Sequence, residues 1–361
     1  PEMITESFLK WNLDLIAIST VSDVVPLVDE NRLIAKYGLL VLSKAKNIGI
    51  DAICKLAGIN QNKINAYSIG FQIGPRINAP GRIDLATGSF KILISDEVNE
   101  VFELAKHLED QNQKRQNSME KIFAAVSRRI EKENLTKNKI IILSDPDWPK
   151  GVIGPVASRL LEKYFRPVIL FREEEKILVG SARSIKDFNI VDGLLKVKKH
   201  LISFGGHSAA AGVQVKKENF QKFSFSITQI ATEEIPDEYL LPKIDIDLKL
   251  EKNKISIRLF QEIENFEPFG MGNPKPIFIT KSLRLKSHRL VGKENNHLQL
   301  VFTNGINDFK AISFNSEIVS SNLKTGSKYD IVYNPGINYW NGKNFIDLRL
   351  IDLKIGDQSG K

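Results

Sequence analysis

The chain has 361 residues, 42% of them hydrophobic, and a formal net charge of +8, which predicts two or three globular domains and favours an anionic partner. No apolar run approaches the roughly 18 residues that cross a bilayer, the first residues lack the pattern of a signal peptide, and the single Cys54 excludes an internal disulfide and a cysteine-rich zinc module. We therefore expect a cytoplasmic protein without a membrane partner, although a solvated lysine-rich surface would give the same charge.

The first 90 residues contain an apolar, β-branched segment at 13–28. We expect it to be a buried strand that runs into a loop carrying Asp23. Such a strand needs neighbours on both sides and none precedes it, so we expect the start of this domain to lie upstream. Residues 31–58 have helical spacing, with Gly58 as the expected stop.

A segment rich in Gly, Pro and Arg occupies residues 69–90 and is predicted to be a turn-rich loop. Within it, "GPRINAPGR" places Arg76 and Arg82 among residues that stiffen the backbone. Two guanidinium groups on a stiff loop suit bidentate contacts to phosphate. The alternative is a structural turn whose arginines pair with nearby carboxylates such as Asp84.

Residues 91–135 are predicted to be a connecting segment built on one long helix. Apolar side chains recur in steps of three and four over 97–133, while the centre of the stripe, Asn112 and Arg115, is polar. We expect a strut whose ends pack on domains and whose middle crosses solvent. The alternative is two helices broken near Gln111.

Residues 136–235 alternate between strand and helix patterns, which predicts a small α/β domain. The expected strands are 139–144, 167–171, 176–182 and 211–215, and the expected helices are 152–165, 189–200 and 217–231.

Small residues surround a single arginine in "VGSARSI" of this domain. Ser181, Arg183 and Ser184 together provide hydroxyls and a guanidinium that suit an anion, whereas the alternative is an ordinary exposed strand end. Gly151 and Gly154 lie at the expected start of a helix, where backbone N–H groups can hold an anion, although close helix packing is the more ordinary explanation.

The segment "SFGGHSAAAGVQV" surrounds a histidine with small residues. Gly205 and Gly206 permit positive φ, and the alanines leave room above the backbone. His207 would donate a hydrogen bond to a phosphate or orient a metal-bound group, and the alternative is a packing role. Together with the two arginine-bearing segments, it predicts an extended anion site.

Residues 236–361 show several short segments of period-two alternation, among them 243–250. An Asn341-Gly342 dipeptide is typical of a two-residue hairpin turn. This pattern predicts a small barrel of the OB type.

Asp23 is the one carboxylate in a strongly apolar setting. A buried carboxylate needs a partner, and a divalent metal is one. One aspartate cannot hold a metal alone, and the sequence contains no HxxxH, HExxH or dense Asp/His cluster. A complete metal site is therefore not expected in these residues.

Six segments occur in a recognisable order: "TVSDVVPL", "GPRINAPGR", "GVIGPVASRL", "GSARSI", "GGHSAAAG" and "FEPFGMGNPKPIF". Together, from about residue 10 to about residue 350, they resemble the RecJ family of single-strand-specific exonucleases in the DHH phosphoesterase superfamily. "GGHSAAAG" alone indicates only the DHH-associated domain, whereas "FEPFGMGNPKP" ahead of a β-rich barrel is more particular to RecJ.

The resemblance implies four parts. They are the C-terminal remnant of a DHH catalytic domain at 1–90, the long connecting helix at 91–135, the DHH-associated substrate-binding domain at 136–235, and the OB-type nucleic-acid-binding barrel at 236–361.

The implied activity is 5′ to 3′ hydrolysis of single-stranded DNA in recombination and repair, with Mn²⁺ or Mg²⁺ in a two-metal site. Asp23 matches the family's late metal-binding aspartate. Arg82, Ser181, Arg183 and His207 match positions that would hold DNA phosphates near the cleavage point. The barrel would grip the strand by stacking and basic contacts, with candidate aromatics Phe269, Phe278, Phe302, Tyr339 and Trp340.

The sequence contains no Asp-His-His motif, and the resemblance places this motif and the family's earlier Asp-x-Asp element upstream. We therefore expect the chain alone to bind single-stranded DNA without cleaving it. A monomer is expected, with a single-strand-binding protein or a helicase as further partners. The alternatives are a non-catalytic DNA-binding or replication-scaffold relative, and a small phosphoesterase acting on oligonucleotides or cyclic dinucleotides.

Overall fold

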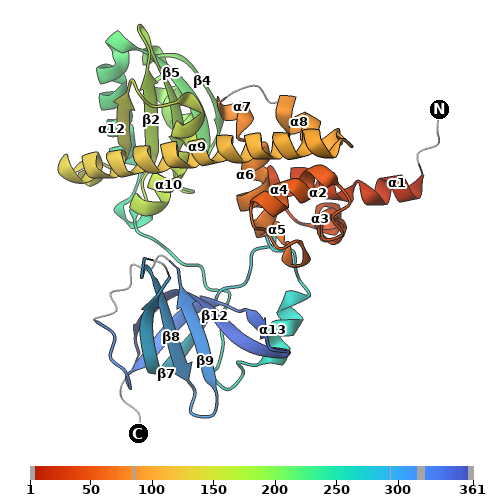
Figure 1. Cartoon of the computed structure of the whole chain (residues 1–361). Helices are drawn as coiled ribbons and strands as arrows, with labels where there is room; N and C mark the ends of the chain where they lie inside the picture. Colours follow the sequence, from red (N-terminus) through yellow and green to blue (C-terminus); the bar gives the residue numbers. More distant parts are fainter. Residues whose placement is uncertain (1–4, 84–86, 293, 315–321, 357–361) are drawn as a thin grey trace. The chain divides into compact units, whose positions relative to one another are not determined.

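The computed structural model describes residues 5–83, 87–292, 294–314 and 322–356, and Figure 1 shows its helices and strands. The chain divides into two compact units, Pro1–Val41 with Ile244–Lys361, and Leu42–Lys243. Both α/β and all-β parts are present, as predicted. Within the described ranges, no helix has the length and apolar character that a membrane span requires.

The first unit opens with three helices, α1 (Glu6–Trp11), α2 (Leu13–Ser22) and α3 (Asp29–Leu42). The prediction of a buried strand at 13–28 is therefore wrong. A Cβ on Gly38 of α3 would lie 2.3 Å from the Cβ of Ala17, so α2 and α3 approach closely through small residues. The local sequence pattern of this segment suits a strand, whereas the helix is stabilised by this contact with a residue farther along the chain.

The predicted helical stretch at 31–58 is two helices, α3 and α4 (Ile48–Leu56). Ala45 has a φ of +52° and lies in the break between them. Gly58 has a φ of +65° directly after α4, which confirms it as the stop.

Most of residues 66–83 and all of residues 87–94 are helical, so the predicted turn-rich loop is wrong. The segment contains α5 (Ala66–Ser68), the π-helix η2 (Ile69–Ile73), α6 (Gly74–Ile77), α7 (Pro80–Ile83) and α8 (Thr87–Ile94). Pro80 is the first residue of α7, where a missing N–H costs no helical hydrogen bond, and Pro75 lies in α6, which follows η2 directly.

The long helix is continuous as α9 (Val98–Lys132), which confirms the single-helix prediction (Figure 1). Its first half packs against α4 and α8, and its second half packs on the sheet domain. Its middle does not cross solvent, because Asn112 is only 1% exposed. The short helices α6 and α7 contact α9 and cover part of its length.

A five-stranded sheet forms the centre of the second unit, with strand order β1-β2-β3-β5-β4. The strands are β1 (Ile141–Asp145), β2 (Val168–Glu173), β3 (Ile177–Arg183), β4 (Leu201–His207) and β5 (Ala210–Lys216). β1 and β2 are parallel and the other pairs are antiparallel. The predicted strands are confirmed, and β4, which contains "SFGGH", is a further strand that the sequence pattern did not indicate.

Helices cover the two faces of this sheet differently (Figure 1). On one face, α9 and α10 (Lys150–Tyr164) pack against β1 and β2. On the other, α11 (Ile190–Lys196) and α12 (Phe220–Glu234) pack against β2, β3 and β5. The first face is exposed over β5 and β4, at Gly212 and Gly205.

The C-terminal strands close into a five-stranded barrel, which confirms the OB-type prediction. Its strands are β7 (Phe278–Val291), β8 (His297–Thr303), β9 (Asp308–Ser313), β10 (Lys328–Asn334) and β12 (Lys343–Ile355). The order β7-β8-β9-β12-β10 closes through pairing of β10 with β7. Helix α13 (Ile257–Glu264) contributes Phe260 to the barrel core.

Two short strands accompany the barrel. The predicted strand at 243–250 is reduced to β6 (Leu248–Lys249). Strand β11 (Ile337–Trp340) pairs with β12 through a turn at Asn341 and Gly342, whose φ values of +49° and +75° confirm the predicted hairpin.

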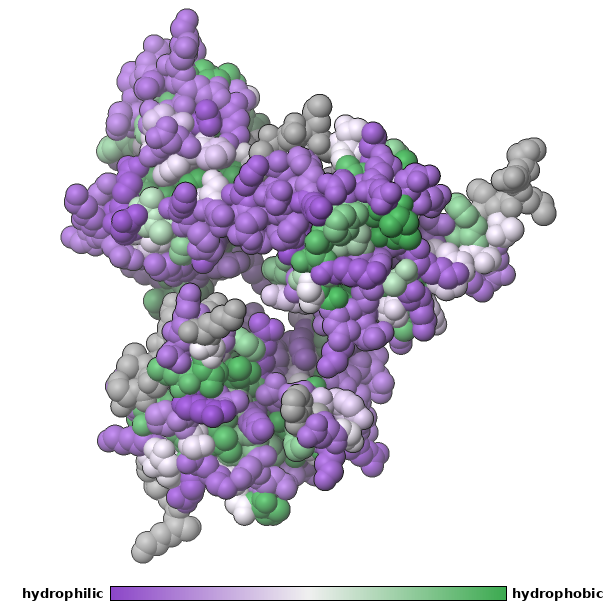
Figure 2. Space-filling view, viewed as in Figure 1, coloured by the Kyte–Doolittle hydropathy of each residue, from purple (hydrophilic) through white to green (hydrophobic). Residues whose placement is uncertain are grey.

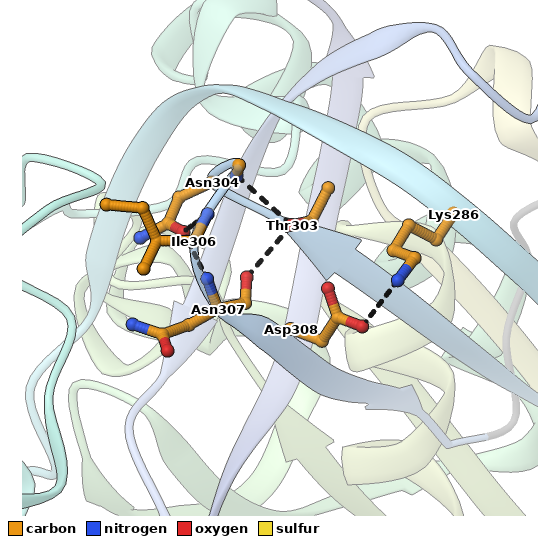
Figure 3. A network of polar contacts seen from close by, with 7 residues as sticks. Lys286, Thr303, Asn304, Ile306, Asn307 and Asp308 are labelled. Carbon is orange, nitrogen blue, oxygen red and sulfur yellow. Dashed lines mark hydrogen bonds and ion pairs between the residues drawn. The ribbon is translucent and has the colours of Figure 1, made fainter.

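Side-chain hydrogen bonds fix the turn between β8 and β9 (Figure 3). Asn304 Oδ1 accepts from the N–H groups of Ile306 and Asn307, at 2.9 and 2.8 Å. Thr303 Oγ1 donates to the carbonyl of Asn307 at 3.0 Å. These bonds fix the conformation of the turn, which in turn fixes how β8 and β9 pair.

Candidate nucleic-acid interface

Three strands bring separate sequence segments onto one face of the sheet. Two rows cross β3, β5 and β4 through paired residues, namely Arg183–Ala210–His207 and Ser181–Gly212–Gly205. Paired residues, and residues two apart on a strand, point to the same face. We call these six residues the three-strand face.

At the two glycines of the three-strand face, Gly205 and Gly212, the backbone is not covered by side chains. A Cβ on Gly205 would meet nothing within 4 Å, and one on Gly212 would meet only the carbonyl oxygen of Gly205, at 4.0 Å. Gly206 is different, because its φ is +149° and a Cβ would lie 2.2 Å from the Ala210 oxygen. Gly206 therefore serves the fold, whereas Gly205 and Gly212 leave room beside exposed His207.

Arg183 is held at the edge of this face against α10. Its Nε donates to Ser158 Oγ at 3.1 Å, and its Nη1 donates to Ser181 Oγ at 2.9 Å and to the Ala182 carbonyl at 2.8 Å. A Cβ on Gly154 would lie 3.0 Å from Arg183 Nη2. The glycine in α10 therefore leaves space for a half-buried guanidinium, and these hydrogen bonds help to hold it in one direction.

Ser184 does not join the three-strand face, although the sequence placed it in the same anion pocket. Its side chain is buried, and its hydroxyl donates to the Phe188 carbonyl at 2.6 Å. Adjacent strand residues point to opposite faces, so the serine next to Arg183 lies inside the domain.

Arg76 and Arg82 lie on the short helices before α9. The Arg76 guanidinium pairs with both carboxylate oxygens of Glu109 on α9 and also donates to the Gln72 carbonyl, at 2.8 Å. Its partner is thus a carboxylate of α9, while Asp84 lies outside the described residues. The Arg82 side chain also lies outside them, so its phosphate contact stays a prediction.

Asp23 is the C-cap of α2 and is exposed, so the expectation of a buried carboxylate there is wrong. The buried one is Asp14, at 4% exposure, and burial raises the pKa of its carboxyl. The sequence pattern missed Asp14 because the apolar run was assigned to a strand. Asp23 belongs to the first unit, and the three-strand face belongs to the second.

The Asp23 carboxylate suits one position in a metal site. Among the described residues, it has no hydrogen-bond or ion-pair partner, and carboxylate oxygens are ligands that Mg²⁺ and Mn²⁺ prefer. The described ranges contain no group of three or more His, Cys, Asp or Glu side chains able to hold a metal. Asp23 therefore fits as a single ligand.

Two of the five aromatic side chains proposed for stacking are in the barrel core. Phe278 is 6% exposed and Phe302 is fully buried, so the prediction that they stack on a base is wrong for both. Phe269 is half-buried, and Tyr339 is 63% exposed. The Trp340 side chain lies outside the described residues.

The outer surface of β8, β9 and β12 carries aromatic rings beside cations, which the sequence analysis missed. The Arg349 guanidinium lies 5.4 Å from the centre of the Phe314 ring, and the Lys310 ammonium lies 6.0 Å from that of Phe345. His297 meets the Phe314 ring edge-on at 5.2 Å. We call these five residues the barrel strip.

Part of the barrel strip could have been predicted from the period-two alternation of "DFKAISF". This alternation places Lys310 and Phe314 on the side opposite the buried Phe309 and Ala311. On the barrel surface visible in Figure 2, hydrophobic and hydrophilic residues are interspersed.

Comparisons with known proteins match both parts of the chain. Residues 137–233 match the DHHA1 domain, and residues 246–352 match the RecJ OB domain. The single-stranded-DNA-specific exonuclease RecJ of Bacillus subtilis is 33% identical over 347 residues, covering 96% of this chain and 44% of that protein. RecJ of Haemophilus influenzae is 34% identical over 302 residues, covering 80% of this chain and 52% of that protein.

A solved structure has a similar fold over nearly the whole chain. The crystal structure of RecJ in complex with Mn²⁺ from Thermus thermophilus has a TM-score of 0.82 and 26% identity, covering 96% of this chain and 50% of that one. The chain thus spans about half the length of these relatives.

Proposed function

Because the chain belongs to the RecJ family, through its DHHA1 and OB domains and its similarity to RecJ proteins, we propose that it binds single-stranded DNA as part of a metal-dependent exonuclease. The observation that carries the proposal is the three-strand face. It combines a fixed guanidinium, an exposed histidine and two glycines whose backbone is not covered by side chains.

Each part of this face would meet a different feature of a DNA strand. Arg183 would place its positive charge against a phosphate, and its serine partners hold that charge in position before DNA binds. His207 would donate a hydrogen bond to a neighbouring phosphate oxygen. Gly205 and Gly212 would let the sugar-phosphate backbone approach the sheet closely.

The barrel strip would bind single-stranded DNA by a different chemistry. Bases stack on exposed aromatic rings regardless of sequence, and adjacent cations attract the phosphates. Phe314 is 50% exposed and Phe345 is 42% exposed, so both rings are open to a base. Stacking on exposed bases favours a single strand over a duplex, whose bases are already stacked.

Hydrolysis requires the divalent metal, Mn²⁺ or Mg²⁺, which activates water and stabilises the leaving oxygen when bound. Asp23 would supply one carboxylate ligand. Because the described residues hold no larger ligand cluster, we propose that these 361 residues bind DNA but need further ligands to cleave it. The 5′ to 3′ polarity, the monomeric state and a single-strand-binding protein or helicase as partner remain part of the proposal.

Fluorescence anisotropy with a labelled 20-nucleotide strand and the matching duplex tests DNA binding. We expect the single strand to bind at least tenfold more tightly than the duplex, since base stacking contributes about 1–3 kcal/mol per base. Equal affinity for the two would contradict a single-strand-specific role.

A nuclease assay on the same chain with Mn²⁺ tests the separate claim about cleavage. We expect no processive degradation of the labelled strand. Robust degradation would show that the metal site is complete and would overturn that claim. The anisotropy measurement of DNA binding tests a separate claim, so its result does not depend on the outcome of the nuclease assay.

A further inference from the structure

The loop after α2 has an unusual backbone directly beside Asp23. Val24 has a φ of +57°, its N–H donates to the Val21 carbonyl at 3.2 Å, and the N–H of Val25 donates to the Thr20 carbonyl at 3.1 Å. This is the Schellman ending, whose left-handed position is usually glycine. A β-branched residue there is an outlier that persists only where the surroundings fix it.

A turn far along the chain contacts this loop. The Leu27 N–H donates to the Met271 carbonyl at 2.6 Å, and the Leu27 side chain is buried. A Cβ on Gly270 would lie 2.7 Å from Leu27 Cδ1. Gly272 has a φ of +73°, and its Cβ would lie 3.1 Å from that of Pro26. Gly272 is favoured by its positive φ, and a side chain at Gly270 would force Leu27 to shift.

The turn is itself fixed by several hydrogen bonds. Gly270 and Asn273 exchange backbone bonds of 2.9 and 3.2 Å. The Asn273 side chain donates to the carbonyls of Phe266 and Pro268, at 2.9 and 3.0 Å. Arg32 of α3 donates to the Phe266 carbonyl at 3.3 Å. We call residues 266–273 the clasp.

We propose that the clasp holds the loop of residues 23–28, including the left-handed Val24, in its observed conformation and thereby sets the direction of the Asp23 carboxylate. Asn273 and Arg32 are then positioning residues, which act through the loop and do not touch a metal. The clasp lies between α13 and β7, so the segment that leads into the barrel also supports the loop of Asp23. Its importance for metal binding rests on the proposed function.

Nuclear magnetic resonance on the 361-residue chain tests the clasp with Gly270→Ala. The added methyl group should displace Leu27, so the Leu27 amide should exchange about tenfold faster with solvent. The Cα chemical shift of Val24 should move to values typical of negative φ. Gly88→Ala is the matched control, because a Cβ there lies 3.8 Å from its nearest neighbour, Leu104, and neither signal should change.

Unchanged exchange at Leu27 together with an unchanged Val24 shift in Gly270→Ala would overturn the proposal. If the barrel resonances of that variant are lost, Asn273→Ala is judged by the same two signals. Arg32→Ala should change the Leu27 exchange rate and the Val24 shift in the same direction but to a smaller extent. Arg32→Lys keeps a hydrogen-bond donor, so both signals should stay close to their wild-type values. A failure of both Asn273→Ala and Arg32→Ala to move either signal would also contradict the clasp.

A separate titration with Mn²⁺ distinguishes the clasp from the metal role of Asp23. Mn²⁺ in excess should contact the Asp23 carboxylate of the wild-type chain transiently, without forming a stable site, and this should broaden the Asp23 and Val24 amide signals. Asp23→Asn should abolish the broadening. In Gly270→Ala the broadening should move to other amides of the loop, which a loss of stability alone would not cause. Absence of broadening in the wild type would contradict the metal role, while the exchange and shift data would still decide the clasp.

Discussion

At the scale of single residues, two aspartates at opposite ends of α2 differ in burial and therefore in role. Asp23 is exposed at the C-cap, where its oxygens are accessible to a ligand. Asp14 is 4% exposed and accepts the Leu15 N–H at 2.7 Å. Burial raises the pKa of Asp14, because desolvation disfavours the ionised form.

Replacing Asp14 with asparagine should therefore stabilise the protein in a pH-dependent way. The raised pKa of Asp14 in the folded state means that stability falls as pH rises from the ordinary aspartate value through the folded value. Asp14→Asn should raise the free energy of unfolding at pH 7, and the gain should vanish below the ordinary aspartate pKa, where both states are protonated. Denaturation curves at pH 7 and below that pKa measure this.

The matched control is Asp23→Asn, which should change the free energy of unfolding by less than about 0.5 kcal/mol, as for a surface substitution, because the side chain is exposed. An Asp14→Asn variant that is less stable at pH 7 would mean that the carboxylate has a stabilising partner.

Sequence could identify residue types at this scale but not their orientation. Arg183 and His207 share one face because β3, β5 and β4 pair in a particular register, which single-sequence patterns do not determine. Ser184 and Phe302 were chosen for their chemistry, yet both are buried. Burial depends on contacts between distant segments, so it could not be assigned from local spacing.

At the scale of elements, the β4–β5 hairpin separates glycines needed for folding from glycines needed for access. Gly206 combines a φ of +149° with a 2.2 Å approach to the Ala210 oxygen. Gly205, one residue earlier, has open space where its side chain would be. The two neighbours should therefore respond differently to substitution.

Gly205→Val should leave the stability of the unit within about 0.5 kcal/mol, as for a surface substitution, while lowering affinity for single-stranded DNA at least tenfold. Its branched side chain would occupy the space proposed for the DNA backbone. Thermal melting and DNA titration of the same preparation measure both effects.

Gly206→Ala is the comparison, and it should lower stability by about 2 kcal/mol or more through strain and clash. Unchanged DNA affinity in a folded Gly205→Val variant would remove Gly205 from the proposed interface.

Helices and strands with strong sequence periodicity could be predicted correctly, whereas the type of element could not be predicted from a short apolar run. The 35 residues of α9 and the strands β1, β2, β3 and β5 follow their patterns. The run at 13–28 has no clear period, and its conformation depends on the close contact of Gly38 with Ala17. Likewise, the prolines of residues 69–90 suggested turns, yet they lie in the first turns of short helices.

At the scale of the whole molecule, the proposed DNA contacts are divided between the two units. The three-strand face belongs to Leu42–Lys243, and the barrel strip belongs to the unit that contains Ile244–Lys361. One strand that contacts both surfaces would gain affinity from each. Substitutions at the two surfaces share no partner, so their effects should add.

Phe314→Ala should therefore weaken binding of a 20-nucleotide strand by about 1–3 kcal/mol, the range for loss of one stacked base. The double variant with Arg183→Ala should show the sum of the two single losses within about 0.5 kcal/mol. Anisotropy titrations of the four proteins measure this. Phe302→Leu, a change in the barrel core, is the control and should leave DNA affinity unchanged in the folded protein.

The salt dependence of DNA binding by Arg183→Ala tests the central claim most directly. Each phosphate contact on a single strand contributes about −0.7 to the slope of log affinity against log salt. Arg183→Ala should make that slope less negative by about 0.7 and weaken binding about tenfold at fixed salt. Lys222→Ala, which removes one charge from α12 on the opposite sheet face, should change neither. An Arg183→Ala slope and affinity equal to those of the wild type would contradict a phosphate-binding role for the three-strand face.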